Sequence, residues 1–332
     1  MKNQNNSYVV AIPSYKRYNI LYNQTLHTLF KNKINPSIIY VFLASETEKK
    51  LYINSLKNII GHKSKNPKIS SKSKNPKISS KSKNPKTSSK SKNTKTSSKS
   101  KNPKISSKSK KPKSISNDEK EFLKNVIFVV GKKGLKNQRN FINTFFPENV
   151  NILQLDDDIK DILQLDYDKK NPKDRKKYNL SSIKNLNKFI IKSFNECLKN
   201  NIYLWGIYPV NNAYFMTPNN TTSLKFIVGP MFGIINRHNK KLKLTVDEKE
   251  NVERTLQHYL VDKKVLRINS VTVKTTYFKT PGGMQSTKRN NNKRMKNALN
   301  SAEYLNKKYP HMTKIYLGKK SGWPELKLKN NT

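Results

Sequence analysis

Three adjacent carboxylates, Asp156, Asp157 and Asp158, are the residues whose types and spacing most directly indicate chemistry. They follow the apolar segment 152–155 and precede Ile159, so an extended segment ends in a cluster of acids. Magnesium and manganese favour such hard oxygen ligands and commonly bind through one or two carboxylates together with substrate phosphates. An acidic turn that simply follows a strand has the same sequence, so the cluster by itself leaves both interpretations open.

Two further motifs are predicted at strand ends and suit phosphate. The first, residues 13–17, follows an apolar run and presents a hydroxyl, an aromatic ring and two cations. The second, residues 131–140, has two glycines that permit a tight turn before a predicted helix. An ordinary strand-ending turn would account for each motif alone. Because ligands of open α/β sheets bind at the carboxyl ends of strands, the three motifs together predict a site for a nucleoside diphosphate with a divalent ion.

Strands and helices alternate along the chain, a pattern typical of an α/β fold. Apolar periodicity predicts strands at 8–12, 37–43, 125–130 and 152–155 and helices at 19–32, 46–56 and 136–145. In the second half it predicts a helix at 181–200 with Ser181 or Ser182 as its N-cap, strand-like segments at 203–208, 212–216, 224–235 and 265–273, and helices at 250–260 and 297–309. The pattern therefore predicts an α/β architecture, a series of strands with helices between them.

A low-complexity repeat interrupts this pattern after the second strand. Residues 63–116 are six copies of a nine-residue unit, the first reading KSKNPKISS, and they hold 19 Lys and no acidic residue. This composition cannot bury enough apolar surface to form a core, so we expect the repeat to be disordered. Since loops accept long insertions at low entropic cost, we expect one domain over residues 7–325, with 326–332 as a tail. The repeat either attracts nucleic acid nonspecifically or is a tolerated expansion of a loop.

Strong positive charge remains when the repeat is set aside. Of the net charge of +47, the repeat contributes +19 and the rest of the chain +28. The charge indicates DNA or another polyanion as a partner, although an AT-rich coding sequence would also enrich lysine.

The composition also bears on the compartment. Cys197 is the only cysteine, which excludes an internal disulfide and favours a reducing compartment. The polar N-terminus lacks the apolar core of a signal peptide, and no window reaches the ~18–20 apolar residues of a membrane span. We therefore expect a soluble intracellular protein, in the cytoplasm or in the viral factory or nucleus of an infected cell, that is not secreted.

The order of the three motifs resembles that of glycosyltransferases of the A-type fold. A strand ends in Pro-Ser-Tyr-x-Arg, then Gly-x-x-x-x-Arg-Asn follows, and then an apolar run leads into Asp-Asp-Asp. Further segments are similar to the TET-associated glycosyltransferases, known mainly from large DNA viruses and phage. These segments are QLDDDI at 154–159, WGIYP at 205–209, ENVERTL at 250–256 and GGM at 282–284. The resemblance covers about residues 7–62 and 117–325. It implies an α/β fold with a Rossmann-like mixed sheet flanked by helices.

The resemblance implies roles for individual residues. Asp156 and Asp158 would hold Mg²⁺ or Mn²⁺ against the diphosphate of a nucleotide-sugar donor, and Asp157 would support them or contact the sugar. The residues that would line the nucleotide pocket are Pro13, Ser14, Tyr15, Arg17, Gly134, Arg139 and Asn140.

The acid-rich segment 247–253 is where the resemblance implies a catalytic base. Such transferases often place an acid near a helix start, where it deprotonates the acceptor or orders the substrate. The candidates are Asp247, Glu250 and Glu253. Relatives often have Glu-Asp where this chain has Glu250-Asn251, so the identity of the base stays open. A solvated, charged helix face is the alternative interpretation.

Five other residues each have two interpretations. Trp205 and Tyr208 either stack on a base or sugar or pack in the core. His258 is either a third metal ligand or a structural residue. Gly282 and Gly283 either let the backbone approach a ligand or form a turn.

The leading functional hypothesis is a metal-dependent glycosyltransferase that moves a sugar from a nucleotide-diphosphate donor to a hydroxyl group. Family resemblance suggests hydroxymethylated pyrimidines in DNA as the acceptor, which must be flipped out or single-stranded. The alternatives are the same chemistry on a protein or glycan acceptor, and a non-catalytic, basic nucleic-acid-binding protein with a decayed enzyme fold.

Overall fold

The computed structural model describes most of the chain outside the repeat. The described residues are 7–61, 115–168, 170–171, 173–275, 282–283, 291–318 and 322–329. Residues 63–114 of the repeat lie outside the described part, so the disorder predicted for them stays a prediction. Its last two residues are described: Ile115 packs against the core, and the Ser116 hydroxyl accepts a hydrogen bond from the Glu119 amide as the N-cap of a helix.

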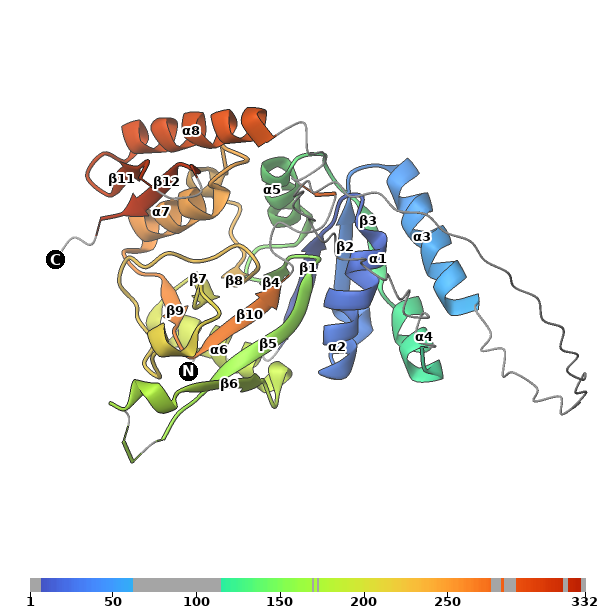
Figure 1. Ribbon diagram of the computed structural model, residues 1–332. Helices are drawn as coiled ribbons and strands as arrows, with labels where there is room; N and C mark the ends of the chain where they lie inside the picture. The colour runs from blue at the N-terminus through green and yellow to red at the C-terminus, as the bar shows by residue number, and fades with distance from the viewer. Residues whose placement is uncertain are drawn as a thin grey trace, which may run out of the picture. The chain divides into compact units, whose positions relative to one another are not determined.

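A seven-stranded mixed sheet with the order β3-β2-β1-β4-β8-β7-β9 forms the centre of the fold (Figure 1). Its strands are β1 (Val9–Pro13), β2 (Ile39–Leu43), β3 (Ile127–Val130), β4 (Asn151–Leu155), β7 (Leu204–Ile207), β8 (Met231–Ile235) and β9 (Leu266–Ile268). The first four strands are parallel to one another, β8 is antiparallel to both of its neighbours, and β7 and β9 are parallel. The predicted α/β fold with a mixed sheet flanked by helices is confirmed.

Helices cover both faces of this sheet, which explains why its strands are almost continuously apolar. Val10 and Ile12 pack on one face with α1 (Tyr18–Leu21), η1 (Tyr22–Leu26), α2 (His27–Lys31), α3 (Glu46–Gly61), α4 (Asn117–Lys124) and α6 (Leu186–Asn200). Ala11, between them in the strand, points to the other face, where α5 (Leu135–Phe145) and Tyr259 of α7 (Glu250–Asp262) contribute to the core. No helix in the described part of the chain is both long and apolar enough to cross a membrane.

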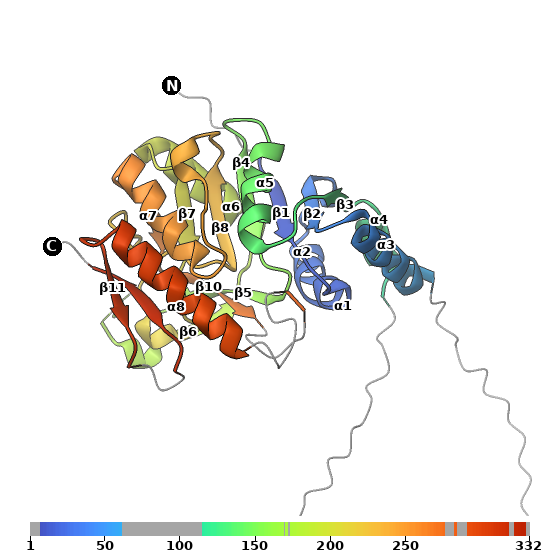
Figure 2. The same ribbon diagram turned by 90° about the horizontal axis from the view of Figure 1, so that it is seen from above.

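Two smaller sheets and several short helices complete the structure. β5 (Ile159–Asp166) lies between β10 (Val271–Thr275) and β6 (Asn179–Ser182), antiparallel to both. β11 (Thr313–Tyr316) pairs with β12 (Glu325–Leu328), and α8 (Asn291–Lys308) packs with them against α7, as Figure 2 shows from above. The 3₁₀ helices are η2 (Pro36–Ile38), η3 (Arg175–Lys177), η4 (Ala213–Phe215) and η5 (Lys240–Leu242).

The strand order places a topological switch point between β1 and β4. From β1 the chain moves outward to β2 and β3, and it then returns to the other side of β1 to form β4. Crevices outside the carboxyl ends of such strands are the usual ligand sites of open α/β sheets. Ser14 follows β1 and Asp156 follows β4, so two of the predicted motifs meet at this point.

Several predicted element boundaries are wrong because side-chain capping and tertiary pairing override local pattern. Residues 181 and 182 belong to β6, and Asn185 caps α6 by accepting a hydrogen bond from the Lys188 amide. The segment 212–216 forms η4 and is not a strand, since Asn212 caps it.

Other differences concern elements that pair over long distances. Only Met231–Ile235 of the predicted strand-like segment 224–235 is a strand, and α4 and β5 were not predicted. Residues 326–328, predicted to lie in a tail, belong to β12, where Leu326 is buried against α7 and α8.

Candidate functional site

A cavity of about 850 Å³ lies at the carboxyl ends of the parallel strands. Its walls come from residues that follow β1, β2, β3 and β4, from the segments 229–230 and 245–251, and from the N-terminal half of α8. This volume lies within the range of small-molecule and cofactor sites, roughly 300–1,000 Å³. The structure thus brings all three predicted motifs to one concave surface.

Ser14 and Asp157 join the ends of β1 and β4. The buried Ser14 hydroxyl donates a 2.6 Å hydrogen bond to Asp157 and lies 2.8 Å from the Tyr52 hydroxyl. Arg17 lies 3.1 Å from the same carboxylate, and its backbone amide donates to Tyr52. Burial raises the pKa of Asp157, whereas Arg17 and Ser14 oppose that shift. Asp157 is therefore an anchor that holds the two strand ends together beneath the cavity.

Asp156 and Asp158 lie on either side of that anchor and are more accessible. Asp156 accepts a 2.9 Å hydrogen bond from Arg139, and its side chain is 35 % exposed. Asp158 lies 3.7 Å from Arg17 with a side chain 14 % exposed. Burial, together with the charges of Asp156 and Asp157, raises the pKa of Asp158 to about 7, while Arg17 opposes the shift.

The turn that carries these acids is held from η1. The Thr25 hydroxyl donates to the Asp156 carbonyl at 2.8 Å and accepts from the Ile159 amide at 2.9 Å. Thr25 lies in a π-helical segment, a local widening of the helix that occurs often at functional sites. Thr28 adds a hydrogen bond to the Ile159 carbonyl. The backbone of the acidic turn is thus fixed before any ligand binds.

The donor set fits a hard divalent cation. The fixed turn carries two accessible carboxylates. Mg²⁺ commonly takes one or two carboxylate ligands from a protein when substrate phosphates supply the others. Among the described residues, no group of three or more His, Cys, Asp and Glu side chains is arranged as a complete metal site. Asp156 and Asp158 could therefore share an ion with a bound phosphate.

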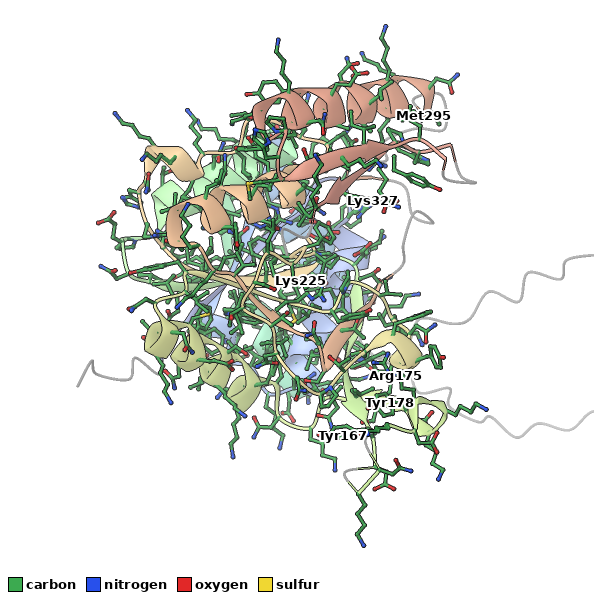
Figure 3. The ribbon with its side chains drawn as sticks, turned by 90° about the vertical axis from the view of Figure 1, so that its left-hand side faces the viewer. Tyr167, Arg175, Tyr178, Lys225, Met295 and Lys327 are labelled. Atoms are coloured by element: carbon green, nitrogen blue, oxygen red, sulfur yellow. The ribbon has the colours of Figure 1, made fainter. Side chains whose placement is uncertain are left out.

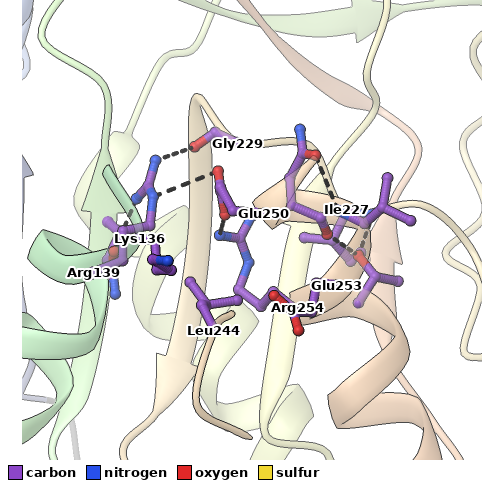
Figure 4. A network of polar contacts seen from close by, with 12 residues as sticks. Lys136, Arg139, Ile227, Gly229, Leu244, Glu250, Glu253 and Arg254 are labelled. Carbon is purple, nitrogen blue, oxygen red and sulfur yellow. Dashed lines mark hydrogen bonds and ion pairs between the residues drawn. The ribbon is translucent and has the colours of Figure 1, made fainter. Parts of the chain in front are cut away.

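Arg139 connects the acidic turn to α7. This buried residue donates to Gln154 at 2.8 Å and to Asp156, and its Nε lies 3.6 Å from Glu250. Glu250 also accepts a 2.7 Å hydrogen bond from Arg254, so its carboxylate lies between two guanidinium groups (Figure 4). Burial lowers the pKa of Arg254 to about 10, partly offset by Glu250. Both arginines lie over the Phe232 ring.

The other two candidate bases have structural partners. Asp247 accepts a 2.9 Å hydrogen bond from the Lys136 amide in the first turn of α5, so it caps that helix from a distant segment while lining the cavity. Glu253 is fully buried and does not line the cavity. Its carboxylate accepts hydrogen bonds from both the amide and the hydroxyl of Thr245 and lies 3.3 Å from Lys308.

Most of the predicted nucleotide-pocket residues line the cavity. Those that do are Pro13, Ser14, Tyr15, Arg17, Gly134 and Arg139. Asn140 does not, because its side-chain amide exchanges two 2.9 Å hydrogen bonds with the backbone of Leu244. Gly134 has a φ of +90°, a conformation that favours glycine at the start of α5.

The residues with two interpretations also have definite places. Trp205 is fully buried against Phe189 and Phe194, and is a core residue. His258 is buried, and desolvation together with Arg237 and Arg254 lowers its pKa to about 3. Gly283 lines the cavity, and its amide donates to the Tyr15 carbonyl at 2.8 Å.

Sequence reasoning missed the residues that support the motif after β1. Glu48, buried on α3, accepts hydrogen bonds from the amides of Lys16 and Ala44, and Tyr52 one turn later contacts Ser14 and Arg17. Their spacing of four residues places both on one face of the predicted helix 46–56. The signal available in the sequence was the acid Glu48 on that helix face. The backbone amides that it accepts from lie in other segments, so the sequence does not show them.

No protein-family model matches the chain, and no curated protein matches it. The functional assignment therefore depends on the geometry of the cavity and on the motifs that form it.

Proposed function

We propose that this protein is a metal-dependent glycosyltransferase of the A-type fold, which moves a sugar from a nucleotide-diphosphate donor to a hydroxyl acceptor. The observation that carries the proposal is the meeting of Asp156, Asp158, Arg17 and Arg139 in one cavity at the switch point between β1 and β4. Carboxylates for a metal and cations for phosphate are the two components that a nucleotide-diphosphate site requires. The mixed sheet and the resemblance of the three motifs support the same assignment.

The donor would bind with its diphosphate at the acidic turn. Asp156 and Asp158 would hold Mg²⁺ or Mn²⁺, which when bound neutralises charge on the leaving diphosphate. Lys132 and Lys133, which line the cavity just before α5, add positive charge beside the phosphates. Ser14 and Arg17 keep Asp157 in place, so the turn need not reorganise when the donor arrives.

The transfer forms one bond and breaks another. The acceptor oxygen attacks the anomeric carbon, the bond between that carbon and the diphosphate oxygen breaks, and the nucleoside diphosphate leaves with the electron pair. The acceptor proton passes to a base, for which Glu250 is the better placed of the two glutamates because it lines the cavity and Glu253 does not. Arg254 and Arg139 hold the Glu250 carboxylate in position.

The proposed acceptor is a hydroxymethylated pyrimidine in DNA. The net charge of +28 outside the repeat favours a polyanion, and a base in a duplex must be flipped out to reach a cavity at the sheet edge. The same chemistry on a protein or glycan is the competing proposal.

A panel of donors and acceptors tests the proposal. Labelled nucleotide sugars are offered with Mg²⁺, Mn²⁺ or a chelator, together with DNA that contains or lacks 5-hydroxymethylpyrimidines, and with protein. We expect metal-dependent label only in the modified DNA. Label in protein would mean that the acceptor is a protein and not DNA, while the enzyme class would stay as proposed. If no donor is turned over, the enzyme assignment is contradicted.

A further inference from the structure

A pair of exposed aromatic side chains lies outside the cavity, on the segment that follows β7. Tyr214 and Phe215 are 53 % and 54 % exposed, and Val210 nearby is 50 % exposed. The two rings meet edge to face, with centroids 5.3 Å apart. Single exposed apolar residues are ordinary, but a contiguous group of them indicates a binding surface.

The aromatic pair is held in a defined position. Asn212 caps η4 by accepting a hydrogen bond from the Tyr214 amide at 3.1 Å. Met216, the next residue after the pair, is fully buried in a small cluster with Leu165 and Tyr178. The segment is therefore anchored on both sides of the rings, which lowers the entropy lost when a ligand packs on them.

A basic segment lies beside the segment that carries these rings. η3 packs against η4, and Arg175 donates a 3.4 Å hydrogen bond to the Tyr214 carbonyl. Lys173, Arg175 and Lys176 are exposed, while Asp174 pairs with Lys177 at 3.4 Å. We call Lys173, Arg175, Lys176, Tyr214 and Phe215 the aromatic–basic surface.

This surface is remote from the cavity. None of its five residues lines the cavity. β5 begins directly after Asp158 and ends at Asp166, and eight residues of strand span about 24 Å. In Figure 3, Arg175 and Tyr178 lie at the opposite end of the molecule from Met295 of α8, the helix that contributes to the cavity wall.

We propose that the aromatic–basic surface binds single-stranded nucleic acid. Unpaired bases would stack on Tyr214 and Phe215, and the phosphates would contact Lys173, Arg175 and Lys176, the combination used by proteins that bind single strands without strong sequence preference. A duplex hides the base faces that the rings need. The inference goes beyond the proposed transferase activity, since binding at this surface requires neither donor nor metal.

Binding of a fluorescein-labelled, 20-nucleotide single strand to the full chain tests the proposal. Fluorescence anisotropy is measured in about 0.3 M salt, which weakens contacts made by the lysine repeat more than base stacking. We expect the double variant Tyr214→Leu/Phe215→Leu to bind about tenfold or more weakly, because leucine keeps apolar area but has no π-face. The variant Tyr214→Trp/Phe215→Trp should retain binding, and Tyr316→Leu, which changes an exposed aromatic on β11, serves as the matched control.

Photocross-linking makes the result specific to the site. A strand that contains 5-bromouracil should cross-link to the peptide carrying Tyr214 and Phe215. Three results would each overturn the proposal: unchanged affinity of the leucine variant, equal affinity for the duplex, or cross-links only to other peptides. Unchanged affinity of the leucine variant is the result expected if the surface binds a protein. The double variant Asp156→Asn/Asp158→Asn should abolish transfer but leave this binding intact, so failure of one proposal can be distinguished from failure of the other.

Discussion

Residues 156–158 and residues 247–253 are both acid-rich segments in a strongly basic chain, yet their carboxylates have different partners. All three acids of the first segment line the cavity, and guanidinium groups or hydroxyls contact them there. The second segment is divided: Glu250 lies in the cavity between two arginines, Asp247 caps α5, and Glu253 holds the backbone at Thr245. The side chains compared in the two segments are all carboxylates. Their roles differ because different backbone amides and cations lie within reach of them.

Removing the two carboxylates that we propose as metal ligands should have the largest effect. The double variant Asp156→Asn/Asp158→Asn should lower the initial rate of donor turnover by about 10³-fold or more, since amides do not replace two anionic ligands. Asp166→Asn, an exposed acid at the end of β5, is the matched control and should turn over at the wild-type rate. A double variant within threefold of wild type would show that the acidic turn is not a metal site.

Glu250→Gln should have the next largest effect. If Glu250 takes the acceptor proton, kcat per folded molecule falls by about 10²–10⁴-fold while the KM for the donor changes little. Steady-state kinetics, normalised to folded protein by circular dichroism, measure this. Full activity in Glu250→Gln together with loss in Asp247→Asn would transfer the role of base to Asp247.

Glu253→Gln should affect stability without affecting the chemistry. The fully buried carboxylate accepts from the Thr245 amide and hydroxyl, and a glutamine would direct its NH₂ group at one of these donors. We expect the free energy of unfolding to fall by about 2–3 kcal/mol, measured by urea titration, with kcat per folded molecule within twofold of wild type. A large loss of kcat in the folded variant would contradict the division between the two glutamates.

Asp247→Ala should have the smallest effect. It removes the acceptor for the Lys136 amide in the first turn of α5, at a cost of about 1 kcal/mol in the same titration. Asp247→Asn keeps an oxygen acceptor and should lie within a few tenths of a kcal/mol of wild type. Equal losses in both variants would mean that charge, and not the cap, is what Asp247 contributes.

Local pattern predicted the first half of the fold well and the second half less well. Apart from α4 and the repeat before it, the strands and helices up to β4 follow one another with short connections. Each is amphipathic or apolar by itself, so periodicity located them within about five residues. β5 pairs with β10, about a hundred residues away in sequence, and a local pattern does not show that pairing. The strand-like segment 212–216 became η4 because Asn212 offers a cap that competes with extended structure.

The sequence predicted most of the residues that line the candidate site but not the residues that support them. Asp156 and Asp158 were recognisable because three acids are unusual after an apolar run in a basic chain. Thr25, Glu48 and Tyr52 fix the backbone around them, but their residue types are common in helices and do not indicate a site. Asn140 was predicted in the nucleotide pocket, but its amide pairs with Leu244 instead.

The sequence by itself determined the alternating strands and helices, the positive charge and the three motifs at strand ends, because each depends on neighbours a few residues apart. Only the tertiary structure decided which acids share the cavity and which cap or brace other elements. It also placed Arg139 between Asp156 and Glu250, and Arg175 of η3 against the backbone of Tyr214 in η4. Those relations depend on strand order and on hydrogen bonds between distant segments, which arise only when the chain packs into its folded form.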